Sequence, residues 1–226
     1  MNQLYTGNLN RLPHSAELKK ICKSIAALEA IICQDWEFRY YSFQKEWSEN
    51  EEFCEMRNGE GDQLLISFGE NGTCINGFAH ESKMNGWQKD SKQEIPVGVV
   101  DELPAVFNDF IFGEPVKSIG TTFCIWQTKT DENWKTGKIK LPNDDYKDGS
   151  SDLLQLLDGN PLTYKNWAEE YYEENFEDSE LALELIEHIY NGAIITKEMI
   201  LKINPELEDF EQLKSDLDEI GYAHKL

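Results

Sequence analysis

The sequence predicts an α+β protein in which an antiparallel β-meander sheet is flanked by helices and followed by an acidic, all-helical C-terminal part. Apolar residues recur at three- and four-residue spacing near the N-terminus and again beyond residue 149, as in helices that bury one face. Between residues 52 and 79, short strand-like runs alternate with turn residues. With 226 residues, 40% of them hydrophobic, the chain is long enough for a substantial core.

The first helix is expected to begin at Ser15, a plausible N-cap, and to run to about Gln34. Its apolar stripe consists of Leu18, Ile21, Cys22, Ile25, Leu28 and Ile32. The next segment, DWEFRYYSF, alternates aromatic and polar residues and therefore predicts a half-buried strand. Trp36 in this segment and Trp126 in the later run GTTFCIWQT are expected in the core.

The meander consists of the runs EFCEMRN, DQLLISF and TCINGFA. Asn71-Gly72 between two of them favours a two-residue hairpin turn, because both turn positions of such a hairpin need positive φ. With this turn, Phe68 faces Ile75 across the hairpin. The core face of the sheet is then Met56, Leu64, Ile66, Phe68 and Ile75.

The same register predicts a polar site on the opposite face, at the end of the run INGFAHES. Arg57, Gln63 and His80 fall in one row, and Glu81 lies beside Asp62 in the next row. A cationic row of this kind could bind an anion or position a substrate. A structural role in a turn, contact with a ligand or partner, and catalysis all remain open for this group.

No metal or cofactor site is expected. A zinc site needs three or four ligands, and the other histidines are isolated from a second His or Cys at ligand spacing. HExxH, P-loop and GxSxG motifs do not occur.

The segment KTDENWKTGKIKLPNDDYKDG is polar and turn-rich, which is typical of a domain boundary. We therefore expect an α+β sheet domain over residues 1–130, a polar linker over residues 131–148 and an acidic helical domain over residues 149–226. The aromatic stripe Tyr164, Trp167 and Tyr171 is expected to pack the helical domain onto the sheet.

Charge is the strongest global signal, with 43 Asp and Glu against 21 Lys and Arg and a formal net charge of −22. From Asp144 to Leu226 the sequence holds 22 acids and 6 bases, a net −16. Such a field repels nucleic acid and anionic membranes and speeds the capture of a basic protein. The candidate contacts are Glu169, Glu170, Glu173 and Glu174. The alternative is that these acids form a solvated face that serves solubility.

Three further tryptophans, Trp47, Trp87 and Trp134, lie in expected loops. An aromatic residue in a loop either anchors a partner or packs down as a local staple. The five cysteines are odd in number and form no CxxC pair, which favours reduced thiols. The N-terminus lacks the features of a signal peptide, and no run of about 18 apolar residues occurs, so we expect a cytoplasmic protein.

The combination of DWEFRYYSF, EMRNGEGDQLLISF, GFAHESKMNGW and LLDGNPLTYKNWAEEYY resembles an uncharacterised bacterial family. That family is in the broad company of the SMI1/KNR4-like immunity proteins of toxin systems, and the resemblance covers roughly residues 15–175. It implies a stoichiometric protein-binding role and no catalytic residues.

We therefore predict a non-enzymatic inhibitor of the immunity type, which neutralises a basic toxin, for example a nuclease, by electrostatic capture and occlusion. The alternative is a small-ligand-binding module or an enzyme with a site at His80, Glu81 and Arg57. A scaffold without a dedicated toxin partner is a third interpretation.

Overall fold

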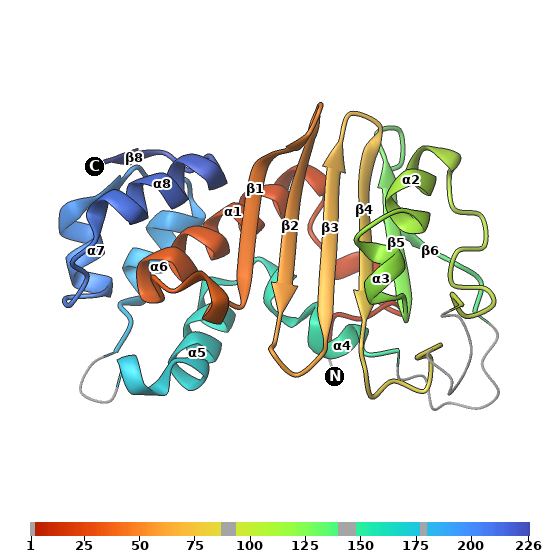
Figure 1. Cartoon of the computed structure of the whole chain (residues 1–226), viewed down its shortest axis with the longest axis horizontal. Helices are drawn as coiled ribbons and strands as arrows, with labels where there is room; N and C mark the ends of the chain where they lie inside the picture. Colours follow the sequence, from red (N-terminus) through yellow and green to blue (C-terminus); the bar gives the residue numbers. More distant parts are fainter. Residues whose placement is uncertain (1–2, 87–93, 140–147, 177–179) are drawn as a thin grey trace.

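The computed structural model describes residues 3–86, 94–139, 148–176 and 180–226. Helix α1 (Ser15–Ile32) crosses one face of a six-stranded antiparallel sheet, and two short helices cover part of the other face (Figure 1). The C-terminal helices lie beside the edge strand β1. The chain is therefore an α+β protein, as the sequence predicts.

The strands of the main sheet follow one another in space in chain order. They are β1 (Tyr41–Ser48), β2 (Glu51–Arg57), β3 (Gln63–Gly69), β4 (Gly72–Phe78), β5 (Phe123–Thr128) and β6 (Lys135–Thr136). Two further strands pair in parallel near the C-terminus: β7 (Ile195–Thr196) and β8 (His224–Lys225). The C-terminal part therefore contains a small sheet in addition to the expected helices.

The remaining helices are short, and several of their turns are of the 3₁₀ type. The α-helices are α2 (Asn108–Phe112), α3 (Val116–Ile119), α4 (Ser150–Leu153), α5 (Pro161–Tyr171), α6 (Leu183–Tyr190), α7 (Lys197–Ile203) and α8 (Phe210–Ile220). The 3₁₀ turns are η1 (Leu9–Arg11), η2 (Trp36–Phe38), η3 (Ala105–Phe107), η4 (Gln155–Asp158) and η5 (Glu173–Asn175).

Helix α1 is the centre of the core. From Ala26 to Ile32 every residue is buried, because the sheet covers one side of the helix and the C-terminal helices cover the other. Ser15 is the first helical residue rather than the expected N-cap. Its hydroxyl lies 2.5 Å from that of Thr73 in β4, and its N–H donates to Gln127 Oε1 at 3.0 Å. These bonds attach the start of the helix to the sheet.

The prediction of a strand that starts at Trp36 is wrong. Asp35 accepts a hydrogen bond from the N–H of Glu37 and so caps the 3₁₀ turn η2, and the strand begins at Tyr41. Trp36 is 49% exposed, whereas Trp126 is 1% exposed and lies in the core as expected. The local cap therefore overrides the alternating pattern.

The core face of the meander is confirmed, but the hairpin register is shifted by two residues. Gly69 pairs with Gly72, so residues 70–71 form the turn, and Ile66 rather than Phe68 is opposite Ile75. A Cβ on Gly72 would lie 2.2 Å from the carbonyl oxygen of Gln127, and its φ is +141°. Glycine is therefore required inside β4 and does not belong to the turn. A two-residue shift leaves every side chain on its expected face.

The stretch expected as a polar linker, residues 131–148, contains strand β6, which pairs with β5. Trp134 in this stretch is 8% exposed and donates its indole N–H to the carbonyl of Pro13 at 2.9 Å. Tyr164, Ile189 and Leu217 from beyond residue 149 belong to the same hydrophobic cluster as α1 and the sheet. The division into residues 1–130, 131–148 and 149–226 stays a prediction, and its first and last parts both contribute to this cluster.

A fully buried carboxylate joins three of these elements. Glu29 of α1 accepts hydrogen bonds from the hydroxyls of Tyr164 at 3.0 Å and Tyr172 at 2.5 Å, and from the N–H of Tyr40 at 2.9 Å. Burial raises the pKa of Glu29, and these donors act in the opposite direction. The carboxylate thereby fixes α5 and the start of β1 against α1.

Glu29→Gln tests this carboxylate. Because folding raises the pKa of Glu29 above its ordinary value of 4.5, the folded state binds the proton of this carboxyl group more tightly than the unfolded state does. The stability that Glu29 contributes to the fold is fully present below the unfolded-state pKa and is lost as the pH rises through the folded-state pKa. Glutamine does not titrate, so the unfolding free energy of wild type minus that of Glu29→Gln should fall as the pH rises above 4.5, measured by urea unfolding. A difference that is constant with pH would contradict this assignment.

Asp216→Ala tests the attachment of α8 to the turn η2. The Nη2 atom of Arg39 lies 2.6 Å from Asp216 Oδ2, and the two side chains are only 5% and 12% exposed. Removing one partner of such a buried pair leaves an uncompensated charge and should cost about 3 kcal/mol in urea unfolding. The control is Glu198→Ala, which breaks the exposed pair with Lys202 and should leave stability nearly unchanged. Equal effects of the two substitutions would contradict the prediction.

Candidate partner-binding site

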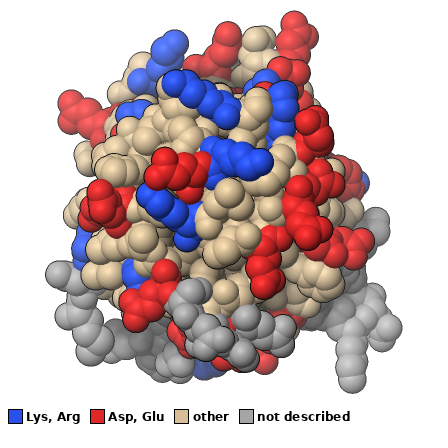
Figure 2. Space-filling model, turned by 90° about the vertical axis from the view of Figure 1, so that its left-hand side faces the viewer, with Lys and Arg blue, Asp and Glu red and all other residues tan. Residues whose placement is uncertain are grey.

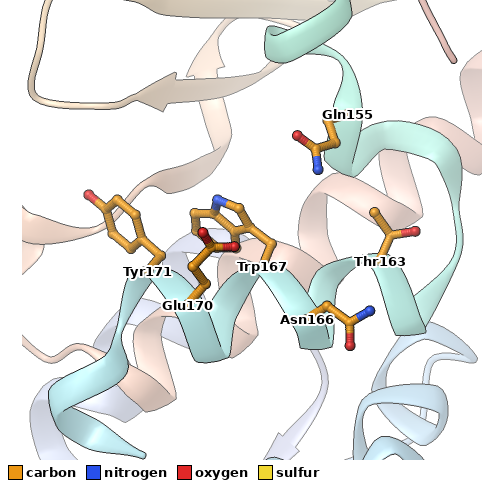
Figure 3. A pocket seen from close by; sticks show the side chains of 6 residues that line it. All are labelled: Gln155, Thr163, Asn166, Trp167, Glu170 and Tyr171. Atoms are coloured by element: carbon orange, nitrogen blue, oxygen red, sulfur yellow. The ribbon is translucent and has the colours of Figure 1, made fainter.

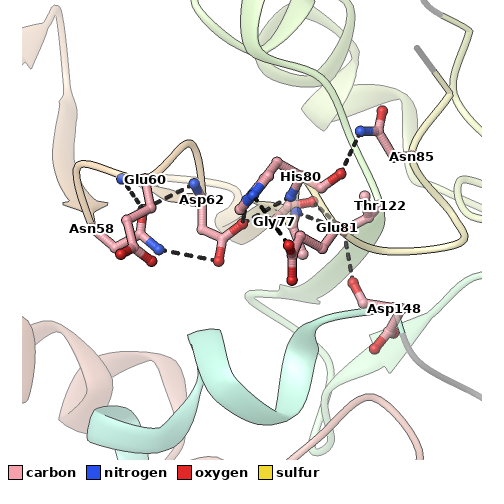
Figure 4. A network of polar contacts seen from close by, with 10 residues as sticks. Asn58, Glu60, Asp62, Gly77, His80, Glu81, Asn85, Thr122 and Asp148 are labelled. Carbon is pink, nitrogen blue, oxygen red and sulfur yellow. Dashed lines mark hydrogen bonds and ion pairs between the residues drawn. The ribbon is translucent and has the colours of Figure 1, made fainter. Parts of the chain in front are cut away.

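The polar group at the end of β4 is built around Asp62. Its Oδ1 atom lies 2.8 Å from the Nδ1 atom of His80 and accepts the main-chain N–H of His80 at 2.8 Å (Figure 4). Asn58 holds the β2–β3 loop in place, because its Oδ1 atom accepts the N–H groups of Glu60 and Asp62. The loop and the end of β4 are thereby joined.

The hydrogen bond that the His80 ring makes to the Asp62 carboxylate raises the pKa of His80, with smaller contributions from the charges of Asp62 and Glu81. Glu81 Oε1 lies 3.9 Å from the Nε2 atom of His80. Both ring nitrogens of His80 therefore face carboxylates, which favours a charged imidazolium. No group of three or more His, Cys, Asp and Glu side chains that could hold a metal ion occurs among the residues that the structure describes.

The predicted row of Arg57, Gln63 and His80 does not form. Arg57 pairs with Gln63 as expected, but the shifted register pairs Gln63 with Phe78 instead of His80. His80 lies beyond the end of β4 and turns to Asp62. The guanidinium of Arg57 stacks over the ring of Trp36, with 4.0 Å between the Cζ atom and the ring centroid.

The tryptophans proposed as partner contacts have different environments. Trp134 is the local staple described above, and its role as a partner contact stays a prediction. Trp47 lies in β1 rather than in a loop, is 43% exposed and stacks on Phe53 with ring centroids 4.3 Å apart. Trp87 lies outside the described residues.

The acidic residues near α5 also differ from one another. Both carboxylate oxygens of Glu169 lie 2.7 Å from Lys165 Nζ, and Oε1 also accepts the N–H of Leu181 at 2.8 Å. The Glu169 carboxylate therefore has partners within the fold, and its role as a partner contact stays a prediction. Glu170 and Glu173 are exposed, and the side chain of Glu174 lies outside the described part of the chain.

The surface of the C-terminal helices is not uniformly acidic. In Figure 2, Lys and Arg side chains lie among Asp and Glu, and the acidic side chains gather towards one border of this face. Ion pairs such as Lys202–Glu198 and Lys214–Asp218 neutralise part of the charge. For the attraction of a basic partner, local groups of carboxylates therefore matter more than the net charge of the chain.

One pocket on this side of the molecule was missed by the sequence-based reasoning. We call it the aromatic pocket; its volume is about 650 Å³, and it is lined by Gln155, Thr163, Asn166, Trp167, Glu170 and Tyr171 (Figure 3). Trp167 and Tyr171 stack with ring centroids 4.9 Å apart and planes 19° apart. Their spacing of four residues on α5 places both rings on one helix face. From the sequence alone, this spacing predicts packing against the sheet and does not indicate a pocket.

Tyr40 connects the aromatic pocket to the sheet. Its ring centroid lies 4.6 Å from that of Trp167 and 5.1 Å from that of Tyr171. Burial raises the pKa of Tyr40 to about 12, with added contributions from Tyr171 and from the carboxylates of Asp62 and Asp152, among others. The negative charges of Asp62 in the β2–β3 loop and Asp152 in α4 therefore contribute to the raised pKa of Tyr40.

The pKa of Tyr171 is raised for similar reasons. Burial is the largest cause of its raised pKa, and Glu60 in the β2–β3 loop contributes through its charge. We refer to Glu60, Asp62 and Asp152, whose charges act on Tyr40 or Tyr171 but which do not line the pocket, as the acidic rim. The aromatic pocket and the acidic rim together offer an exposed aromatic surface next to negative charge. Such a surface can bind a cation through ring faces and carboxylates at once.

Comparison of the chain with protein-family models, with curated proteins and with solved structures finds no match. None of the helices in the described ranges combines the length and the apolarity that crossing a bilayer requires. The fold and the site thus define an α+β protein with an aromatic, acid-rimmed pocket, and the functional argument depends on that geometry.

Asp62→Asn tests the polar group at the end of β4. It should lower the pKa of His80 towards its ordinary value of 6.5, because the hydrogen bond from the His80 ring to the Asp62 carboxylate is the largest cause of the raised pKa. The measurement is an NMR titration of the histidine ring protons. Glu81→Gln is the matched control and should have a smaller effect, since this carboxylate is 3.9 Å away. An equal or larger effect of Glu81→Gln would show that the assignment of causes is wrong.

Proposed function

We propose that the protein is a non-enzymatic inhibitor of the immunity type, which binds a basic protein partner and occludes the partner's functional site. The observation that carries this proposal is the exposed aromatic pocket next to the acidic rim, in a chain with a net charge of −22. The sequence resemblance to immunity proteins of bacterial toxin systems points in the same direction.

Binding would proceed in two physical stages. The negative field of the chain steers a basic protein towards the surface and raises the association rate. The stacked rings of Trp167 and Tyr171 then supply large, rigid contact area, and rings of this kind dominate the binding energy of many interfaces.

A stable protein interface buries roughly 800 Å² on each partner, more than one pocket supplies. Adjacent exposed groups would therefore join the contact, among them His80 and Glu81 beyond the β2–β3 loop. A partner that covers both the aromatic pocket and this loop would have its own surface blocked over the same area. Inhibition follows from occlusion alone, with no chemical step.

The proposed location is the cytoplasm. All five cysteines are free thiols, and four of them are buried, as is common for proteins of a reducing compartment. The proposed partner is a protein and not a nucleic acid, because the acidic field repels phosphate backbones.

The test is capture of the partner on the immobilised full-length chain, from a lysate of the source cells at low salt. We expect a basic protein that is released at high salt, that binds in purified form with one-to-one stoichiometry, and whose toxicity on expression is relieved by co-expression of this chain. The proposal fails if no protein is captured above background, or if the captured protein is not toxic.

Charge variants then test the steering. The triple variant Glu60→Gln, Asp152→Asn, Glu173→Gln removes two exposed charges of the acidic rim and the exposed charge of Glu173 in η5, just after α5. We expect it to slow association with the purified partner about tenfold at low salt and to flatten the salt dependence, measured by stopped-flow mixing.

The matched control removes the same number of charges between α7 and α8 and in the first turn of α8, at Glu206, Glu208 and Glu211, which are also exposed. It should slow association no more than about twofold, because its charges lie outside the proposed contact. Equal slowing by both variants would place the steering charge elsewhere on the surface.

A further inference from the structure

The aromatic pocket contains a carboxylate that has no cationic partner among the residues that the structure describes. Glu170 makes no ion pair with any described residue, whereas its neighbour Glu169 is held by Lys165. Figure 3 shows the Glu170 side chain beside the Trp167 indole and at the base of Tyr171, all on α5. An unpaired carboxylate next to two stacked rings is a favourable place for a positive charge.

The other lining groups supply polar contacts around these rings. Gln155 approaches from η4 on the far side of the pocket. Thr163 and Asn166 lie on α5 on the N-terminal side of Trp167 (Figure 3). The amide oxygens of Gln155 and Asn166 are hydrogen-bond acceptors, which a ligand with several N–H donors can use. The pocket therefore combines a flat aromatic surface, one carboxylate and two amides.

We propose that the aromatic pocket is a binding site for the guanidinium group of an arginine side chain, presented by the basic partner. This inference rests on the proposed function and names the group that the partner inserts. Arginine fits better than lysine, because its planar guanidinium stacks on an aromatic face while its five N–H donors reach acceptors at the rim. A lysine ammonium is more strongly hydrated and has only three donors.

The rings are held in position before the ligand arrives. Tyr40 packs against both Trp167 and Tyr171, and the N–H of Tyr40 is bound to the buried carboxylate of Glu29. Tyr172, which follows directly on α5, donates its hydroxyl to the same carboxylate. Little conformational entropy is then lost when an arginine binds.

The volume of the pocket supports a ligand that belongs to a chain. A hollow of about 650 Å³ is larger than one guanidinium needs. The remaining space can hold the alkyl stem and adjacent backbone of a peptide segment. Tyr171 is 41% exposed, so the pocket is open to such a segment from outside.

The first test titrates the full-length protein with N-acetyl-arginine methylamide and follows the indole N–H signal of Trp167 by NMR, assigned with Trp167→Phe. The neutral isostere N-acetyl-citrulline methylamide and the blocked lysine are the comparison probes. We expect arginine to saturate the signal at millimolar concentration, lysine to bind at least about fivefold more weakly, and citrulline not to bind measurably.

The matched variants are Glu170→Gln and Glu173→Gln, which remove the same charge from exposed positions inside and outside the aromatic pocket. Glu170→Gln should weaken arginine binding at least about fivefold, and Glu173→Gln should change it less than about twofold. Tyr171→Leu should also weaken binding, since it removes the more exposed of the two stacked rings. Thermal unfolding confirms that each variant is folded before titration.

Three outcomes overturn the inference: no shift of the Trp167 signal by arginine, equal binding of citrulline, or no effect of Glu170→Gln. Its failure is distinguishable from failure of the proposed function. A toxic protein that is captured equally well by Glu170→Gln and wild type keeps the proposed function and removes the arginine site. If the pocket binds arginine but no protein is captured, the assignment of the pocket as a guanidinium site stands and the proposed inhibitor function is contradicted.

Discussion

The buried carboxylate of Glu29 is the interaction on which the arrangement of the other elements depends. It is the one acidic side chain on the otherwise apolar, fully buried half of α1, and desolvation of a charge there is costly. Three donors compensate this cost, two from the region of α5 and one from the start of β1. Helix α5 can therefore pack in only one way against α1 and the sheet, since any displacement would leave a buried carboxylate and buried hydroxyls unsatisfied.

The same interaction positions the surface pocket. Helix α5 turns Tyr164 and Ala168 inwards, with Tyr172 following at the same spacing, and this face meets Glu29. The adjacent face of the helix carries Trp167, Glu170 and Tyr171 towards the surface. Tyr40 lies between the two sets, with its N–H on the carboxylate and its ring on the outer aromatics. A polar bond in the core thus determines the geometry of an aromatic surface where a partner could bind.

The fold class and the buried face of each meander strand could be predicted from the sequence, because alternation survives a two-residue shift in register. The site could not, because the row of Arg57 and His80 required the right pairing partner and not only the right face. That pairing depends on close contact between Gly72 and the backbone of β5, more than 50 residues away in the chain. The turn at Trp36 was missed because the Asp35 cap and the bonds from Arg39 to the end of α1 outweigh alternation. The spacing of Trp167 and Tyr171 was visible, but their contact with Tyr40 joins residues distant in sequence.

The role of each acidic residue depends on its neighbours and not on the net charge. Glu169 and Glu170 are adjacent in sequence and equally acidic, yet one turn of α5 places Glu169 next to Lys165 and the main chain of Leu181. Its charge is used within the fold. Glu170 lies about 100° further round the helix, beside the aromatic rings and with no described cation to neutralise it. If a basic partner distinguishes this surface from the rest of an acidic molecule, it does so where the fold leaves such carboxylates unpaired beside an aromatic ring, because there both the charge and the ring face remain accessible to a cation.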